Sequence, residues 1–174
     1  MVIESTSLTK AYAKEFINVS VMVGSLIKRP GRLIKNNFII WPIWFTIAGI
    51  WAVISLLFLI MHGNVMLGIV FGALFGAAFI GFRTYYFCLK RLKSIMNTNR
   101  HITYTLDENG FVYDNHDNKV MTVYWKDYQC IRVLKNGSYL IPKDESGFAF
   151  GIQKEFYDQV KDFLKENNID IKEI

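Results

Sequence analysis

Two long runs without charged residues constrain this chain more than any other feature. Residues 43–60 are 18 consecutive residues with no charge, and residues 65–82 are another 18 with no polar side chain. At a rise of about 1.5 Å per residue each run reaches about 27 Å, close to the hydrocarbon thickness of a bilayer. A hairpin buried in a soluble core is the alternative, but the rest of the chain is too small to cover two helices that are apolar all round. The sequence predicts a transmembrane hairpin, with helices at about 38–61 and 65–89.

Aromatic and basic residues stand at the outer ends of both runs. Trp41 and Trp44 begin the first helix, and Arg83, Tyr85 and Tyr86 end the second. Aromatic rings are enriched at membrane–water boundaries, and an arginine at mid-bilayer would cost about 2.5–3.5 kcal/mol. We therefore interpret these five residues as boundary residues. A functional charge inside the membrane at Arg83 is the alternative.

The charges predict how the hairpin is oriented. Residues 1–100 carry 11 Lys and Arg against two acidic residues, whereas residues 101–174 carry nine against 13. The basic residues nearest the hairpin, which we expect to contact anionic lipids, are Lys28, Arg29, Arg32, Lys35, Lys90, Arg91 and Lys93. An excess of Lys and Arg marks the cytoplasmic side, so both termini are predicted to be cytoplasmic. Nucleic acid is not an expected partner, because these charges flank the hairpin instead of forming a face of a folded domain.

Small residues recur at intervals of four in the second apolar run. Gly68, Gly72 and Gly76 form a smooth stripe on which another helix backbone can approach closely. The simplest interpretation places this stripe against the first helix of the same chain, near Gly49. Homodimerisation, or docking on another membrane protein, is the alternative.

The N-terminal segment, residues 1–37, contains a predicted strand at 2–7 and an amphipathic helix at about 8–27. This helix either lies along the inner leaflet or packs on the C-terminal domain, and its pattern alone does not decide between them. Together with the hairpin and its flanks (38–100) and a C-terminal domain (101–174), it completes a predicted division into three parts.

The C-terminal part changes to the alternation of β-strands. Strands are predicted at 101–106, 111–113, 120–125, 128–134, 138–142 and 148–151. Turn residues separate them, and we interpret the stretch from Asp114 to Asn118 as a polar loop and not as a metal site, since it lacks the carboxylate spacing of a calcium loop. An amphipathic helix at 153–167 ends the pattern. The fold class is predicted to be α+β, with an antiparallel pleckstrin-homology-like domain closed by a C-terminal helix; a simple meander is the alternative.

Two stretches of this domain resemble a known family. The stretch from Val120 to Tyr128, and then Tyr139 to Lys143, are similar to the YcxB-like family of small bacterial membrane proteins. Trp125 with Asp127, and the run Ile141, Pro142 and Lys143, carry the resemblance. It implies two membrane helices before a domain of this type, in the bacterial cytoplasmic membrane. It implies no activity.

Several common catalytic patterns are absent from the sequence. It has no phosphate-binding glycine loop, no HExxH and no Gly-x-Ser-x-Gly elbow. Its two cysteines, Cys88 and Cys130, have no metal-ligand spacing. We expect no cofactor, no metal and no enzymatic activity. The predicted function is a membrane-anchored interaction or regulatory module; the alternative is an accessory or self-protection protein that acts through helix contacts in the bilayer.

Overall fold

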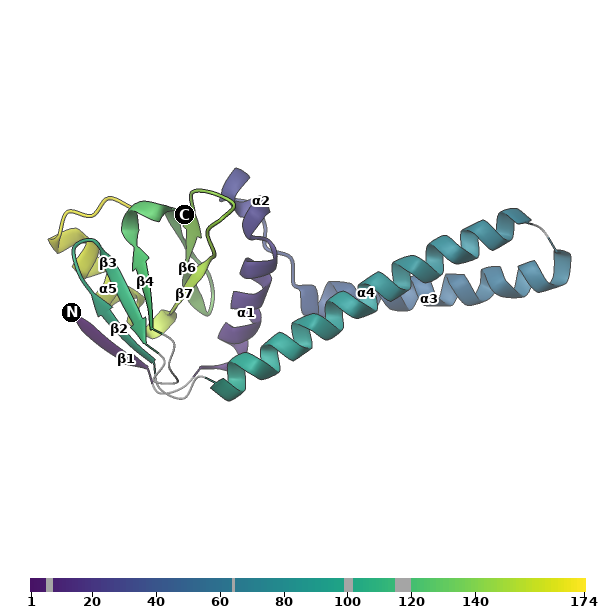
Figure 1. Cartoon of the computed structure of the whole chain (residues 1–174), viewed down its shortest axis with the longest axis horizontal. Helices are drawn as coiled ribbons and strands as arrows, with labels where there is room; N and C mark the ends of the chain where they lie inside the picture. Colours follow the sequence, from purple (N-terminus) through teal and green to yellow (C-terminus); the bar gives the residue numbers. More distant parts are fainter. Residues whose placement is uncertain (6–7, 64, 99–101, 115–119) are drawn as a thin grey trace. The chain divides into compact units, whose positions relative to one another are not determined.

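The computed structural model describes residues 1–5, 8–63, 65–98, 102–114 and 120–174. The chain forms two units, shown in Figure 1. The globular unit consists of Met1–Ile34 and Leu92–Ile174, and the helical hairpin consists of Lys35–Arg91. This division differs from the three predicted parts, because the N-terminal segment belongs to the same unit as the C-terminal domain.

Two long helices make the hairpin. Helix α3 spans Asn37–His62, and helix α4 begins at Val65. Asn36 starts α3 by accepting the backbone N–H of Phe38 at 3.2 Å. Gly63 ends it with a left-handed φ of 62°, a conformation that glycine adopts without steric cost.

Helix α4 is longer than predicted. It ends at Thr98, nine residues beyond the predicted end at Leu89. No glycine or proline interrupts residues 90–98. Buried Cys88 and Leu92, followed by half-buried Ile95, continue one helical face at intervals of four and three residues. The prediction from the apolar run alone therefore ended the helix too early, because α4 continues with an amphipathic pattern.

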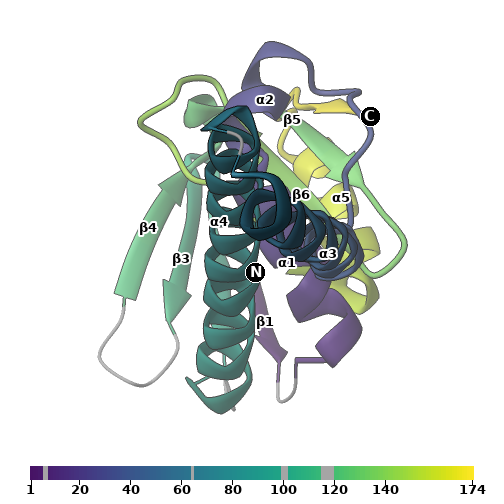
Figure 2. The same cartoon turned by 90° about the vertical axis from the view of Figure 1, so that its right-hand side faces the viewer.

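The globular unit contains two four-stranded sheets. The first has the order β1 (Val2–Ser5), β2 (Ile102–Leu106), β3 (Gly110–Asp114) and β4 (Val120–Tyr124), all antiparallel. The second has the order β7 (Phe150–Gln153), β6 (Gly137–Pro142), β5 (Tyr128–Val133) and β8 (Lys172–Glu173), with β8 parallel to β5. In Figure 2, β3 and β4 lie on one side of this unit and β5 and β6 on the other.

Each of the six predicted strands is present within two residues of its predicted bounds. The predicted strand at 148–151 lies at Phe150–Gln153 instead, because Phe148 is half exposed in the preceding loop and Phe150 is the residue that pairs with Leu140. The predicted polar loop after Asp114 falls largely outside the described residues. Strand β8 was not predicted, since two residues carry no readable alternation.

Helices from both ends of the chain complete one hydrophobic core. The predicted N-terminal helix is divided at Met22 into α1 (Lys10–Val21) and α2 (Val23–Lys28). Tyr12, Val19 and Leu26 from these helices are buried in the same core as the strands. Of the two alternatives for the N-terminal helix, the structure therefore shows packing on the β-sheets, where α1 lies beside β6 (Figure 1).

Helix α5 (Lys154–Glu166) is the predicted C-terminal helix. It buries Tyr157, Val160 and Leu164 in this core and keeps its charged side chains outside. The globular unit with its mainly antiparallel sheets and the two long apolar helices make the chain an α+β protein, as predicted.

Candidate functional site

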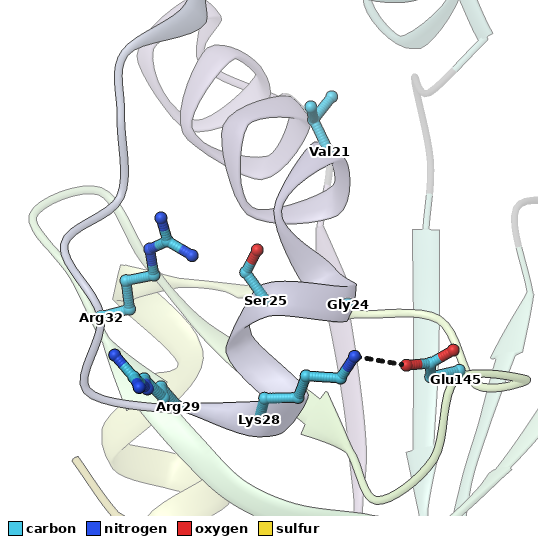
Figure 3. A pocket seen from close by; sticks show the side chains of 7 residues that line it. All are labelled: Val21, Gly24, Ser25, Lys28, Arg29, Arg32 and Glu145. Carbon is cyan, nitrogen blue, oxygen red and sulfur yellow. Dashed lines mark ion pairs between the residues drawn. The ribbon is translucent and has the colours of Figure 1, made fainter.

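A hollow of about 650 Å³ lies over α2 in the globular unit (Figure 3). Three parts of the chain line it: the end of α1 with α2, the segment that follows α2, and the loop between β6 and β7. The lining residues are Val21, Gly24, Ser25, Lys28, Arg29, Arg32 and Glu145. We refer to it as the α2 hollow.

Two side chains of β5 hold the end of α2. The register of β5 against β6 shifts between Tyr128 and Cys130, which leaves Gln129 in a bulge. The Gln129 amide donates to the carbonyls of Ile27, at 3.1 Å, and of Pro142, at 3.0 Å. The last carbonyls of a helix lack partners within the helix, so this bond caps α2 from the sheet.

Arg132 holds the segment after α2 in the same way. Its guanidinium donates to the Pro30 carbonyl, and the residue is only 8% exposed. Burial lowers the pKa of Arg132 from its usual value, yet an arginine keeps its charge at neutral pH. Among the residues that the structure describes, no carboxylate lies within 4.0 Å of this guanidinium. A buried positive charge therefore braces the turn that carries Arg29 and Arg32.

The loop on the other side of the hollow is fixed by Asp144. Its carboxylate accepts the backbone N–H groups of Ser146 and Gly147, at 3.0 and 3.1 Å, and the Ser146 hydroxyl at 2.5 Å. The hydrogen bonds from Ser146 lower the pKa of Asp144, which keeps it charged as the acceptor of this turn. Glu145 stands at the tip of the turn and faces Lys28.

The α2 hollow is positively charged. Lys28, Arg29 and Arg32 supply three positive charges, and Glu145 is the one acidic residue among those that line it. The Lys28 ammonium lies 3.3 Å from the Glu145 carboxylate, with side chains 74% and 70% exposed. An exposed pair of this kind contributes between about 0 and 1 kcal/mol. In Figure 3 the Arg32 guanidinium points toward the Ser25 hydroxyl, on the opposite side from this pair.

Of the seven predicted lipid-contacting residues, the structure brings three together. Lys28, Arg29 and Arg32 line the hollow. Lys93 also belongs to the globular unit, whereas Lys35, Lys90 and Arg91 belong to the hairpin; all seven are exposed.

The faces by which α3 and α4 meet differ from those predicted. A Cβ built on Gly68 would contact Leu59 at 3.7 Å, but one built on Gly72, Gly76 or Gly49 would meet nothing within 4 Å. The close approach is at Gly81, where a Cβ would lie 3.0 Å from that of Phe45.

Helix α3 buries three small residues, Ala48, Ala52 and Ser55, and α4 buries Gly81. Phe45 adds an edge-to-face ring contact with Phe82 at 5.8 Å. Ala48 and Ala52 are also a pair of small residues four apart. This spacing is visible in the sequence, but the prediction was based on the glycines alone.

Replacing Ala52 with leucine is expected to destabilise the hairpin, whereas replacing Gly72 with leucine is not. Ala52 is 3% exposed, and overpacking at a buried position costs about 1–3 kcal/mol. The measurement is the thermal loss of helical circular dichroism of the full chain in detergent. Equal melting temperatures for the two variants would contradict this packing.

The predicted boundary residues lie at matching depths of the hairpin. Trp41 of α3 lies beside Gly81 of α4, since a Cβ at Gly81 would be 3.6 Å from the Trp41 ring. Trp44, Arg83 and Tyr86 are exposed, and Tyr85 packs near Phe45 with ring centroids 6.1 Å apart.

The residues that carry the resemblance to the YcxB-like family have structural roles. Buried Trp125 donates its indole N–H to the Asp107 carbonyl at 3.0 Å. The Asp127 carbonyl accepts the backbone N–H of Lys143 at 2.9 Å, and Ile141 and Pro142 are fully buried. These residues thus join the end of β6 to the short helix at Trp125–Asp127.

Cys130 does not have the surroundings of a nucleophile. It is 1% exposed, and burial raises the pKa of its thiol, against smaller opposing effects of Arg132 and Lys172. A neutral buried thiol is inert. Among the described residues, no group of three His, Cys, Asp or Glu side chains is placed to hold a metal ion.

Sequence reasoning missed Ser25, Glu145, Gln129 and Arg132. The first two line the hollow, and the other two brace it. Glu145 is 117 residues from Lys28 in the chain, so no local pattern could have paired them. The one signal visible in the sequence was Arg132, an arginine in an otherwise apolar strand. A buried charge requires a specific partner, so this residue indicated a structured contact.

No protein-family model, curated protein or solved structure matches this chain. Its class therefore follows from the fold and the site alone: an α+β protein with a long apolar helical hairpin and a globular unit that carries a basic hollow.

Proposed function

We propose that this chain is a membrane-anchored protein of the bacterial cytoplasmic membrane, whose globular unit is a non-enzymatic interaction module for anionic partners at the membrane surface. One observation carries the proposal. Helices α3 and α4 are long and apolar enough to cross a bilayer, and only 17% and 6% of their apolar windows are buried. Apolar surface exposed on this scale indicates that lipid or another partner covers it.

The basic residues support the orientation in which both termini are cytoplasmic. The stretch at residues 62–64, where α3 ends and the chain turns back, contains no Lys or Arg, whereas both outer ends of the hairpin are flanked by them. Leu33 is 85% exposed and stands between Arg32 and Lys35, a combination typical of a segment that meets a membrane surface.

A pleckstrin-homology-like fold is our proposal for the globular unit. Its support is the strand order: β1 to β4 in sequence in one sheet, then β5 to β7 in sequence in the other. Helix α5 follows and buries Val160 and Leu164 in the shared core. The resemblance to YcxB-like proteins agrees with this topology and stays a prediction.

Cysteine labelling in intact cells tests the membrane topology. We expect His62→Cys, at the end of α3 beside the turn, to react with a membrane-impermeant maleimide from outside the cell. Lys154→Cys, at the start of α5, is expected to react only after lysis. The full chain is expected to remain in the membrane fraction until detergent is added. Labelling of residue 154 in intact cells, or a chain that is soluble without detergent, would contradict the proposal.

A second candidate function is that of an accessory or self-protection protein that binds a partner helix in the bilayer. The observation that favours it is the open stripe at Gly72 and Gly76, which α3 does not cover. A homodimer or another membrane protein would supply the helix. Gly72→Leu should then break the complex while leaving the hairpin folded, as crosslinking in native membranes would show.

A further inference from the structure

We propose that the α2 hollow is a receptor for a phosphate monoester group, and that Glu145 acts as an internal competitor that holds Lys28 when no ligand is bound. The inference rests on the proposed function, because it names the chemistry of the anionic partner. A lipid head group and a soluble organic phosphate both carry such a group.

The charge of the hollow matches this ligand. Three positive side chains and one negative one line it. A phosphate monoester carries about −1.5 to −2 at pH 7, so one such group would neutralise the remaining charge. A carboxylate carries less negative charge, so part of the positive charge of the hollow would stay unbalanced.

The donors of the hollow suit phosphate oxygens. The guanidinium groups of Arg29 and Arg32 present planar forks that bind phosphate in a bidentate manner, and the Lys28 ammonium is a mobile point charge. The Ser25 hydroxyl of α2, which also lines the hollow, supplies a further donor (Figure 3). A nucleic acid is a poorer match, because base stacking needs aromatic rings and the lining contains none.

The backbone of the hollow is arranged before any ligand arrives. Gln129 holds the Ile27 carbonyl, and Arg132 holds the Pro30 carbonyl between Arg29 and Arg32. Both come from β5, which pairs with β6 and β8 in the second sheet. A site whose backbone is already fixed loses less entropy on binding.

Glu145 is placed to compete with the ligand. Its carboxylate lies 3.3 Å from the Lys28 ammonium, and both side chains are largely exposed. A charged ligand with more than one oxygen can displace so weak a pair, and Lys28 is then free to turn toward the phosphate. Removing the carboxylate should therefore strengthen binding.

Calorimetric titration of the full chain in a zwitterionic detergent tests the inference. The ligands are glycerol 3-phosphate, dihexanoyl phosphatidate and, as the zwitterionic control, dihexanoyl phosphatidylcholine. We expect saturable binding of a monoester and none of phosphatidylcholine. Equal affinity for the two monoesters assigns the site to a soluble phosphate, and tighter binding of phosphatidate assigns it to a lipid; either result supports the inference. Absence of binding for both monoesters would overturn it.

Three variants connect binding to the hollow. Arg29→Gln with Arg32→Gln is expected to weaken monoester binding about tenfold or more, because charge-assisted bonds to phosphate are lost. Glu145→Gln is expected to strengthen it by about threefold, the effect of losing one weak exposed pair. Lys154→Gln with Lys165→Gln removes the same charge from α5, outside the hollow, and should leave affinity unchanged.

The outcomes separate this inference from the membrane proposal. Equal losses in the arginine pair and in the α5 pair would show non-specific attraction and overturn the inference. If the glutamine pair fails to fold, Arg29→Lys with Arg32→Lys retains the charge and should still lose the bidentate contacts; unchanged affinity there would also overturn it. Neither result affects the cysteine-labelling test, which reports the membrane topology and not the binding of phosphate.

Discussion

Replacing Glu15 with alanine is expected to lower the free energy of unfolding of the globular unit by about 3 kcal/mol, because hydrogen bonds to a charged group contribute about 1.5–3 kcal/mol. The Glu15 carboxylate of α1 accepts the backbone N–H and the side-chain amide of Asn136, at 3.1 and 2.9 Å, and the Tyr139 hydroxyl at 3.0 Å. Tyr139 is 0% exposed, so the variant leaves its hydroxyl buried without this acceptor.

The same contact joins the N-terminal segment to the β-sheets. Burial, together with the charge of Glu15 and its hydrogen bond, raises the pKa of Tyr139, so its hydroxyl keeps the proton that it donates. Amide hydrogen exchange of residues 10–28, measured by mass spectrometry on the full chain, should become markedly faster in Glu15→Ala. Since α2 follows α1 directly, binding at the α2 hollow should weaken in parallel.

Tyr139→Phe is the matched control. This variant removes one hydrogen bond to the Glu15 carboxylate. It leaves no unpaired hydroxyl, and the carboxylate still accepts the two hydrogen bonds from Asn136. We expect a loss of about 1 kcal/mol in chemical denaturation, the net value of one hydrogen bond. An unfolding free energy of Glu15→Ala equal to that of the wild type would contradict the role assigned to Glu15.

Replacing Gly110 with alanine should be at least as damaging to the globular unit. A Cβ at this position would lie 1.9 Å from the Val123 carbonyl oxygen and 2.9 Å from the Tyr124 Cα, both on the neighbouring strand β4. Backbone atoms in a paired strand cannot turn aside as a side chain can, so β3 and β4 must separate at this point. We expect a loss of about 3 kcal/mol or more, at the upper end for overpacking.

Thermal unfolding of the full chain in detergent, followed by near-ultraviolet circular dichroism, measures this loss. The transition of the globular unit should fall by about 10 °C or more, given its size. Gly31→Ala is the control, because a Cβ there meets nothing within 4 Å and the residue is exposed. Equal transitions for the two variants would show that the β3–β4 pairing is not as tight as the structure shows.

Local patterns determine the elements that depend on local physics. The uncharged runs at 43–60 and 65–82 appear as helices, and the alternation after residue 101 appears as antiparallel strands. Period and hydrophobicity are properties of residues close together in the chain, so they can be recognised in the sequence without the tertiary structure. One pattern was incomplete: the prediction for helix packing used Gly68, Gly72 and Gly76, whereas the close approach is at Gly81 against Phe45, and Ala48 and Ala52 of α3 are buried.

Long-range pairing decides the rest. Strand β1 pairs with β2 across about 100 residues of chain, and Glu15 meets Tyr139 across 124. Gly137 and Gly151 are needed because the Tyr12 ring packs against them, a reason that exists only once α1 lies on the sheet.

By itself the sequence determined the apolar hairpin, its basic borders and the strands of the C-terminal part, since these follow from hydrophobicity, charge and period along the chain. Only the tertiary structure decided that the N-terminal helices share the core of the sheets, and that Lys28, Arg29 and Arg32 surround one hollow with Glu145. Contacts between distant segments depend on how whole elements pack, which no local pattern encodes.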